Sequence, residues 1–163
     1  MGTQTILRTV EDTLTELGLD WTRSANRSVT VNLPGSRKLT TACTFDLGRH
    51  MVTIHAFVAR RPEENHDAVH RWLLERNLKL ALVGFAVDRD GDIHLHGRFP
   101  TAALTPELVD TVCGIVAETA DDSFNTILEL GFASSIEAEW RWRLARGEST
   151  RNLEAFTGLR PPQ

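Results

Sequence analysis

The histidines are the side chains in this sequence whose spacing could most directly support catalysis. His66 and His70 are four residues apart, so on a helix both rings would lie on one face, as in zinc-binding pairs. His94 and His96 would share one face of a strand, and His55 could lie near them. The two pairs together could supply the ligands of a metal-dependent hydrolase, which is the alternative function that the sequence offers.

The same sequence also weakens the metal interpretation. Helical zinc proteases need a glutamate directly after the first histidine, and here Asp67 follows His66. No feature of the sequence brings the helical pair and the strand pair together. Exposed or hydrogen-bonded histidines account for the pattern more simply. We therefore expect no metal, no cofactor and no catalytic residue in this chain.

Three alternating aspartates, Asp88, Asp90 and Asp92, resemble the start of a calcium-binding loop. The glycine that such a loop needs is displaced to Gly91, and Phe99 stands where the bidentate glutamate should be. Asp-Gly is a favoured pair for a tight hairpin turn. The segment therefore predicts a turn between two strands rather than a calcium site.

A charged junction at residues 60–64 could contact a partner. Arg60 and Arg61 carry planar guanidinium groups that can clamp a carboxylate or a phosphate, but Glu63 and Glu64 lie close by in the chain. Because these acids are local, we favour internal ion pairs that fix the start of a helix. Both arginines stay candidate partner-binding residues.

A basic, aromatic cluster occupies residues 140–143, which read Trp-Arg-Trp-Arg. On a helix Trp140 and Trp142 point in different directions, so one should be core and the other exposed or at an interface. Stacking on nucleic acid is a further use of such residues, but Glu137 and Glu139 dilute the positive charge. A helix that completes the fold or binds a partner is the favoured interpretation.

The composition is that of an ordinary globular protein, with 163 residues, 41% of them hydrophobic and 25% charged. The net charge of -4 repels phosphate backbones, so nucleic acid is not the expected partner. Cys43 and Cys113 share no motif spacing, and the N-terminus lacks the order of a signal peptide. The apolar run at residues 80–87 is too short to span a membrane. We expect a cytoplasmic protein with reduced thiols and no membrane partner.

Hydrophobic periodicity places the first elements. Apolar residues at helical spacing predict a helix over residues 6–17, ended by Gly18 in a left-handed cap. Alternating residues then predict three strands, within residues 21–33, 39–45 and 51–58. A hairpin joins the last two of them.

The second half begins with a helix that starts between residues 62 and 66, with Asn65 as its N-cap. Residues 80–87 are apolar on both faces, which predicts either a central strand or an edge strand hidden in a subunit interface. In the return strand, Ile93, Leu95 and Gly97 should face the core. Its other face should carry Asp92, His94, His96 and Arg98.

Two helices complete the chain. Thr105 before a proline predicts the start of a long helix, and residues 121–123 predict a kink or a restart within it. Ser134 and Glu137 predict a capping box for a final helix that ends at Gly147. The order of helix, three strands, helix, two strands, long helix and extra helix predicts an α+β fold, in which helices cover an antiparallel sheet.

Four stretches of this sequence resemble the YbjN-domain family. They are LPGSRKLTT at 33–41, FVARRPEENH at 57–66 leading into RWLLERNL at 71–78, GDIHLHGRFP at 91–100 and SFNTILELGFASSI at 123–136. They fall in the family's order and span most of the chain. The resemblance implies the fold of type III secretion chaperones and the label of bacterial sensory transduction regulators, and it supplies no catalytic residue.

The expected protein is thus a non-enzymatic protein-binding module, chaperone-like or a regulatory adaptor, that forms a homodimer and binds an unidentified protein partner. We expect one YbjN-like domain over residues 1–157 and a mobile tail over 158–163. The candidate partner-binding residues are Arg60, Arg61, His94, His96, Arg98, Trp140, Trp142 and Arg143.

Overall fold

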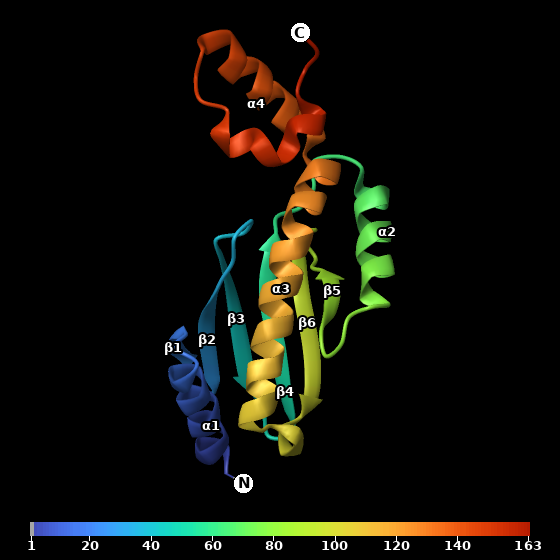
Figure 1. The fold of residues 1–163 in the computed structure, drawn as a ribbon. Helices are drawn as coiled ribbons and strands as arrows, with labels where there is room; N and C mark the ends of the chain where they lie inside the picture. Colours follow the sequence, from blue (N-terminus) through green and yellow to red (C-terminus); the bar gives the residue numbers. More distant parts are fainter. Residues whose placement is uncertain (1) are drawn as a thin grey trace.

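The computed structural model describes residues 2–163 and shows one sheet with helices on one side of it (Figure 1). The strands are β1 (Asp20–Ala25), β2 (Ser28–Pro34), β3 (Thr40–Leu47), β4 (Met51–Ala59), β5 (Gly84–Val87) and β6 (Ile93–Pro100). They pair antiparallel in the order β1-β2-β3-β4-β6-β5. The predicted α+β fold, an antiparallel sheet covered by helices, is confirmed.

The helices are α1 (Thr3–Glu16), α2 (His66–Asn77), α3 (Pro106–Gly131) and α4 (Ala133–Arg146), with the 3-10 segments η1 (Thr101–Ala103) and η2 (Arg151–Leu159). In Figure 1, α3 runs along the sheet, α2 lies beside β5, and α4 with η2 projects beyond one end of the strands. Among residues 2–163, no helix combines the length and the apolar content needed to cross a membrane.

Strict alternation along the strands gives the sheet two different faces. On one face, side chains such as Val31, Phe45, Ile54 and Leu95 are buried beneath α1 and α3. The residues between them point the other way and are mostly exposed or half-buried. Because successive side chains alternate between faces, one apolar and one polar set of residues suffices to build a sheet that is covered on a single side.

The N-terminal end of the sheet differs from the prediction. Residues 21–33, expected to form a single strand, form the hairpin β1–β2, in which Asp20 pairs with Asn32. β1 is exposed along nearly all its length, so it lacks the apolar alternation that marks a strand in sequence. The sheet therefore has one strand more than predicted.

The apolar run at residues 80–87 contributes an edge strand, so of the two predicted positions the central one is excluded and the edge one is found. Only Gly84–Val87 pairs, and it pairs with β6 alone. The preceding residues follow an irregular path in which Leu82 has a φ of 66°. They pass close to Gly97, where an added Cβ would lie 2.2 Å from the Leu82 carbonyl oxygen. Val83 and Phe85 supply the burial that the sequence pattern required.

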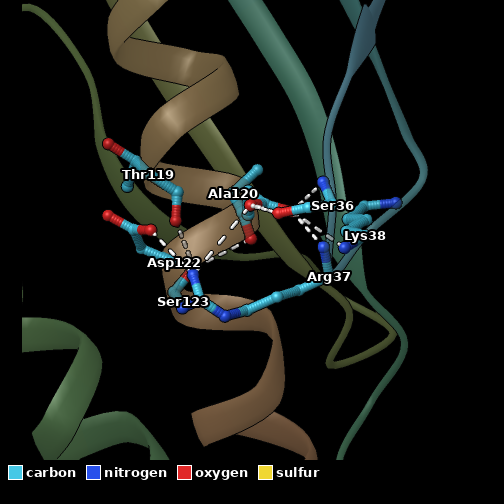
Figure 2. A network of polar contacts seen from close by, with 8 residues as sticks. Ser36, Arg37, Lys38, Thr119, Ala120, Asp122 and Ser123 are labelled. Atoms are coloured by element: carbon cyan, nitrogen blue, oxygen red, sulfur yellow. Dashed lines mark hydrogen bonds and ion pairs between the residues drawn. The ribbon is translucent and has the colours of Figure 1, made fainter.

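α3 continues without interruption through residues 121–123, so the predicted restart was wrong. Residues of this type break helices when their side chains compete for the helix backbone. Here Asp121 instead accepts from the β2–β3 loop, through the backbone N–H groups of Ser36 at 2.9 Å, Arg37 at 2.7 Å and Lys38 at 2.9 Å. The Ser36 hydroxyl donates to the second carboxylate oxygen at 3.0 Å. The loop thus lies against the middle of α3 (Figure 2).

These bonds favour the ionised carboxylate, and they hold the pKa of Asp121 below its ordinary value. The backbone of Lys38 contributes most to this shift. The loop also depends on Gly35, since a Cβ there would lie 2.3 Å from the Lys38 carbonyl oxygen and 2.7 Å from Asp121 Oδ1. The loop and the helix therefore specify each other's conformation.

Asp121→Asn should lower the free energy of unfolding by about 1–2 kcal/mol at pH 7, because three N–H donors lose a charged acceptor. A folded-state pKa below the ordinary value of about 3.9 means that the stabilisation is complete at neutral pH. It is lost as the pH falls through the folded-state pKa, so the difference between the two proteins should shrink below about pH 4. Urea titrations at several pH values measure this.

Asp122→Asn is the matched control for that experiment. Asp122 is 42% exposed and pairs with Arg37 at 3.0 Å, so its loss should cost less than about 0.5 kcal/mol. Equal effects of the two substitutions would contradict the role given to Asp121.

Candidate functional site

Three imidazoles gather on the uncovered side of the sheet. Its register pairs His55 of β4 with His96 of β6, Phe57 with His94, and Thr53 with Arg98. The predicted division of β6 is confirmed, since Ile93, Leu95 and Gly97 are buried and the intervening residues are not. We call this surface the open face, and it consists of Thr53, His55, Phe57, His94, His96 and Arg98.

A chain of hydrogen bonds runs through the open face. Asp88 Oδ2 lies 2.6 Å from His94 Nε2, and His94 Nδ1 lies 3.0 Å from His55 Nε2. A carboxylate can only accept, so His94 Nε2 donates to Asp88. In the neutral ring this leaves His94 Nδ1 as the acceptor of the His55 N–H. The tautomers of both rings are therefore fixed by Asp88.

The same contacts shift two pKa values. Partial burial lowers the pKa of His55, and the neighbouring charges of His94 and His96 lower it further. The hydrogen bond from His94 lowers the pKa of Asp88 most, and the backbone N–H groups of Asp92 and Asp90 add to this effect. Asp88 is thus a firm anchor for His94 at neutral pH.

Sequence reasoning did not include His55 or Asp88 among the candidate partner-binding residues. The alternation of residues 51–58 contained the signal for His55, because it places this side chain on the polar side of its strand. Asp88 carried no comparable signal, since its interaction with His94 depends on how the β5–β6 turn folds back. That turn forms at the predicted Asp90 and Gly91, with Gly91 at a φ of 89°.

The four histidines of the alternative hydrolase are not assembled into one site. His66 and His70 lie on α2, where His66 Nε2 bonds to the Pro62 carbonyl oxygen at 2.7 Å. His94 and His96 lie on the open face. Within residues 2–163, no group of three or more His, Cys, Asp or Glu side chains is placed to hold a metal ion.

The charged junction before α2 forms the predicted internal ion pair, with Arg60 and Glu63 2.7 Å apart. Arg60 also lies over the Phe132 ring, 4.4 Å from its centroid. The Arg61 N–H donates to Asp92 at 2.8 Å, which ties the junction to the β5–β6 turn. Both candidate residues are exposed, but Arg60 is engaged in the fold through its side chain, whereas Arg61 bonds to Asp92 through its backbone N–H.

The junction also holds the start of α4, which the sequence did not predict. Glu64 accepts from the Ser134 N–H at 2.6 Å and from its hydroxyl at 2.9 Å. Glu63 accepts from the Ser135 hydroxyl, and this bond is the largest single cause of the lowered pKa of Glu63, followed by the hydrogen bond from Arg60. The predicted capping box of Ser134 with Glu137 was wrong, because an acid 70 residues away in sequence takes its place.

One tryptophan of the cluster is buried and the other is exposed, as predicted. The buried one, Trp140, is therefore no longer a candidate partner-binding residue. Trp140 is 2% exposed, and its Nε1 donates to the Phe156 carbonyl oxygen at 3.1 Å, so it belongs to a small core between α4 and η2. Trp142 is 45% exposed, with the Arg146 guanidinium over its ring. Arg143 bonds to Glu139 at 2.6 Å and to the Ser149 carbonyl oxygen at 2.9 Å. Only Trp142 offers an aromatic surface here.

A second exposed surface lies on α2 and the irregular segment that follows it. Leu74 is 66% exposed, Leu78 88% and Leu82 40%, while the buried side of the helix contacts α3 and β5. Leu74 and Leu78 line a shallow groove together with Asp67, His70, Arg71 and Glu75. We call this area the α2 surface.

The sequence model of the YbjN family, described as "Putative bacterial sensory transduction regulator", matches residues 7–129. The chain belongs to the YbjN family. The match includes most of α1, the whole sheet, α2 and nearly all of α3, whereas α4 and η2 lie beyond it. The open face and the α2 surface are both within the matched part.

Two mycobacterial relatives support this YbjN assignment. An uncharacterized protein of Mycobacterium leprae is 49% identical over 129 residues, which are 79% of this chain and 70% of that protein. An uncharacterized protein of Mycobacterium tuberculosis strain H37Rv is 50% identical over 131 residues, which are 80% of this chain and 72% of that protein.

Solved structures with the same fold include type III secretion proteins. The crystal structure of the ExsC-ExsE complex matches with a TM-score of 0.57 at 18% identity, over 77% of this chain and 95% of that one. The Yersinia pestis type III secretion chaperone SycH, in complex with a fragment of YscM2, matches with a TM-score of 0.51 at 14% identity, over 73% and 97%. At these identities the likeness shows the fold, and the chaperone-like architecture implied by the sequence resemblance is confirmed.

Trp140→Ala should loosen α4 and η2 and leave the sheet intact. A small core separate from the main one contains Trp140, Leu153 and Phe156. Deleting a buried tryptophan costs about 3–5 kcal/mol, and here this cost should lower the free energy of local opening of α4 and η2. Hydrogen exchange should show faster exchange within residues 133–159 and unchanged protection in β3, β4 and β6.

Trp142→Ala removes an exposed ring from the same helix. It should change the free energy of local opening, measured by hydrogen exchange, by no more than about 0.5 kcal/mol. If the two variants exchange alike, or if loss of Trp140 exposes the sheet, the separate core is refuted.

Proposed function

We propose that this YbjN protein is a non-enzymatic protein-binding module, a chaperone or regulatory adaptor, that acts as a homodimer in a bacterial cytoplasm. The observation that carries the proposal is the one-sided sheet. The open face presents imidazole, guanidinium and hydroxyl groups, with the Phe57 ring 43% exposed among them. Polar donors combined with partly exposed aromatic rings are common at protein interfaces.

The comparisons support a partner of protein nature. The related folds were solved as complexes, ExsC with ExsE and SycH with a fragment of YscM2. The family description names a role in sensory transduction. We propose that His94, His96 and Arg98 are the core of the partner site and that Trp142 lies outside it, since α4 is beyond the matched family region.

We further propose that the α2 surface is covered by a second copy of the chain. β5 is an edge strand that pairs only with β6, but the Asn77 side chain already bonds to the backbone N–H and C=O of Phe85, at 2.7 and 3.2 Å. The contact between copies is therefore made by side chains of α2 and not by strand pairing. Leu74 and Leu78 supply apolar contact, and charges of both signs flank them. When two such helices meet antiparallel, Arg71 of each copy can face an acid of the other, so this surface is complementary to itself.

A Leu74→Glu, Leu78→Glu variant should be monomeric, because it buries like charges against each other at the proposed interface. Light scattering at micromolar concentration should give about twice the chain mass of 18.2 kDa for the wild type and about that mass for the variant. Leu39→Glu is the control, since Leu39 is 78% exposed but lies in the β2–β3 loop. A wild type that stays monomeric at every concentration would contradict the proposed dimer.

The partner site is tested separately by affinity capture from a lysate of the native host. A His96→Asp, Arg98→Glu variant should lose the captured protein, because it places two negative charges on the open face where a histidine and an arginine stand. An Arg141→Glu variant changes the charge of an exposed residue of α4 and should retain it. Capture that survives the first variant and fails with the second would move the partner site to α4.

A further inference from the structure

The open face can take up protons in a stepwise manner that its hydrogen bonds define. In the neutral state His94 donates to Asp88 and accepts from His55. One added proton is accommodated, since His55 can carry it on Nδ1 and still donate to His94 through Nε2. A second proton places N–H groups on both nitrogens of the 3.0 Å contact, so the bond is lost and two cations repel.

Few other charges face this cluster. On β3, Thr44 lies opposite His55, and the next acid, Asp46, already accepts from the Ser28 hydroxyl at 3.0 Å. On β5, Gly84 pairs with His96 and Ala86 with His94, so this strand adds no charge.

The remaining charged neighbours are Asp88, which accepts a hydrogen bond from His94, and the cationic residues Arg98 and Lys38. Arg98 is on the open face itself, and Lys38 lies 6.0 Å from the centroid of the Phe57 ring. Asp46 accepts from a hydroxyl and Asp88 from His94, so both acids near the face already bond to donors of this chain. Protonation therefore adds positive charge to a face on which the acid nearest the imidazoles is already paired.

We propose that the open face binds an acidic segment of a partner protein, and that proton uptake by its histidines as the pH falls strengthens this binding. The inference rests on the proposed function, because it specifies the chemistry of the partner for the same face. Carboxylates fit the site since imidazolium and guanidinium groups donate to them in charge-assisted bonds. Opening of the His55–His94 contact frees both rings to reach the partner.

The test uses a labelled peptide of alternating Glu and Ser, whose carboxylates stay ionised down to about pH 5. Fluorescence anisotropy at fixed ionic strength should show binding to the full chain that is about tenfold tighter at pH 5.5 than at pH 7.5, the effect of about two added surface ion pairs. A His55→Gln, His96→Gln variant leaves only His94, which stays bonded to Asp88, and should lose most of this pH response. Both residues are exposed, and circular dichroism checks that the variant folds.

His66→Gln, His70→Gln is the matched control, because it removes the same number of imidazoles from α2 and should keep the full pH response. Three results would overturn the inference: affinity independent of pH, a pH response that survives in the His55 and His96 variant, or equal binding of an oligothymidine of the same charge. None of these results affects the affinity capture by the open face or the dimer mass from light scattering. Failure of the pH response can therefore be distinguished from failure of the proposed function.

Discussion

The packing of α3 against one side of the sheet is the contact on which the rest of the molecule depends. Val109, Val112, Val116 and Ile127 of this helix are fully buried, and α3 also contacts α1, α2, α4 and η2. A single helix of 26 residues therefore joins every layer of the fold. Because it covers only one side, the other side of the sheet is left to polar residues, and the open face follows from the same packing that makes the core.

Much of the fold was predictable because its rules are local. Period-two alternation identified the two sides of β2, β3, β4 and β6, and the capping residue Thr105 and the left-handed Gly18 lie where the sequence placed them. Two of the errors share one physical cause. Asp121 reads as a helix breaker and Ser134 as the start of a capping box, but their partners lie 85 and 70 residues away in sequence. The pattern of residues adjacent in sequence carries no information about contacts between residues so far apart in the chain.

The candidate site shows the same division between local and distant contacts. Alternation predicted that His94, His96 and Arg98 share a face, and helical geometry predicted that one tryptophan of residues 140–143 is buried. Helical geometry could not predict which of the two tryptophans is buried. That choice depends on η2, which folds back so that the Phe156 carbonyl accepts a hydrogen bond from Trp140. Nor could the sequence pattern join Asp88, His94 and His55, because their bonds require the register between β4 and β6 and the path of the turn.

The chemistry of the two proposed surfaces suits the different tasks assigned to them. A constitutive contact between copies is best made by apolar side chains, whose association is insensitive to pH and salt, and the α2 surface carries exposed leucines. A regulated contact needs groups whose charge can change. An open sheet face that was apolar would aggregate, so solubility already requires polar residues there. Placing histidines at three of these positions meets that requirement, and under the proposal it would make the affinity of the face depend on a pH change that leaves the apolar contacts of the proposed dimer unaltered.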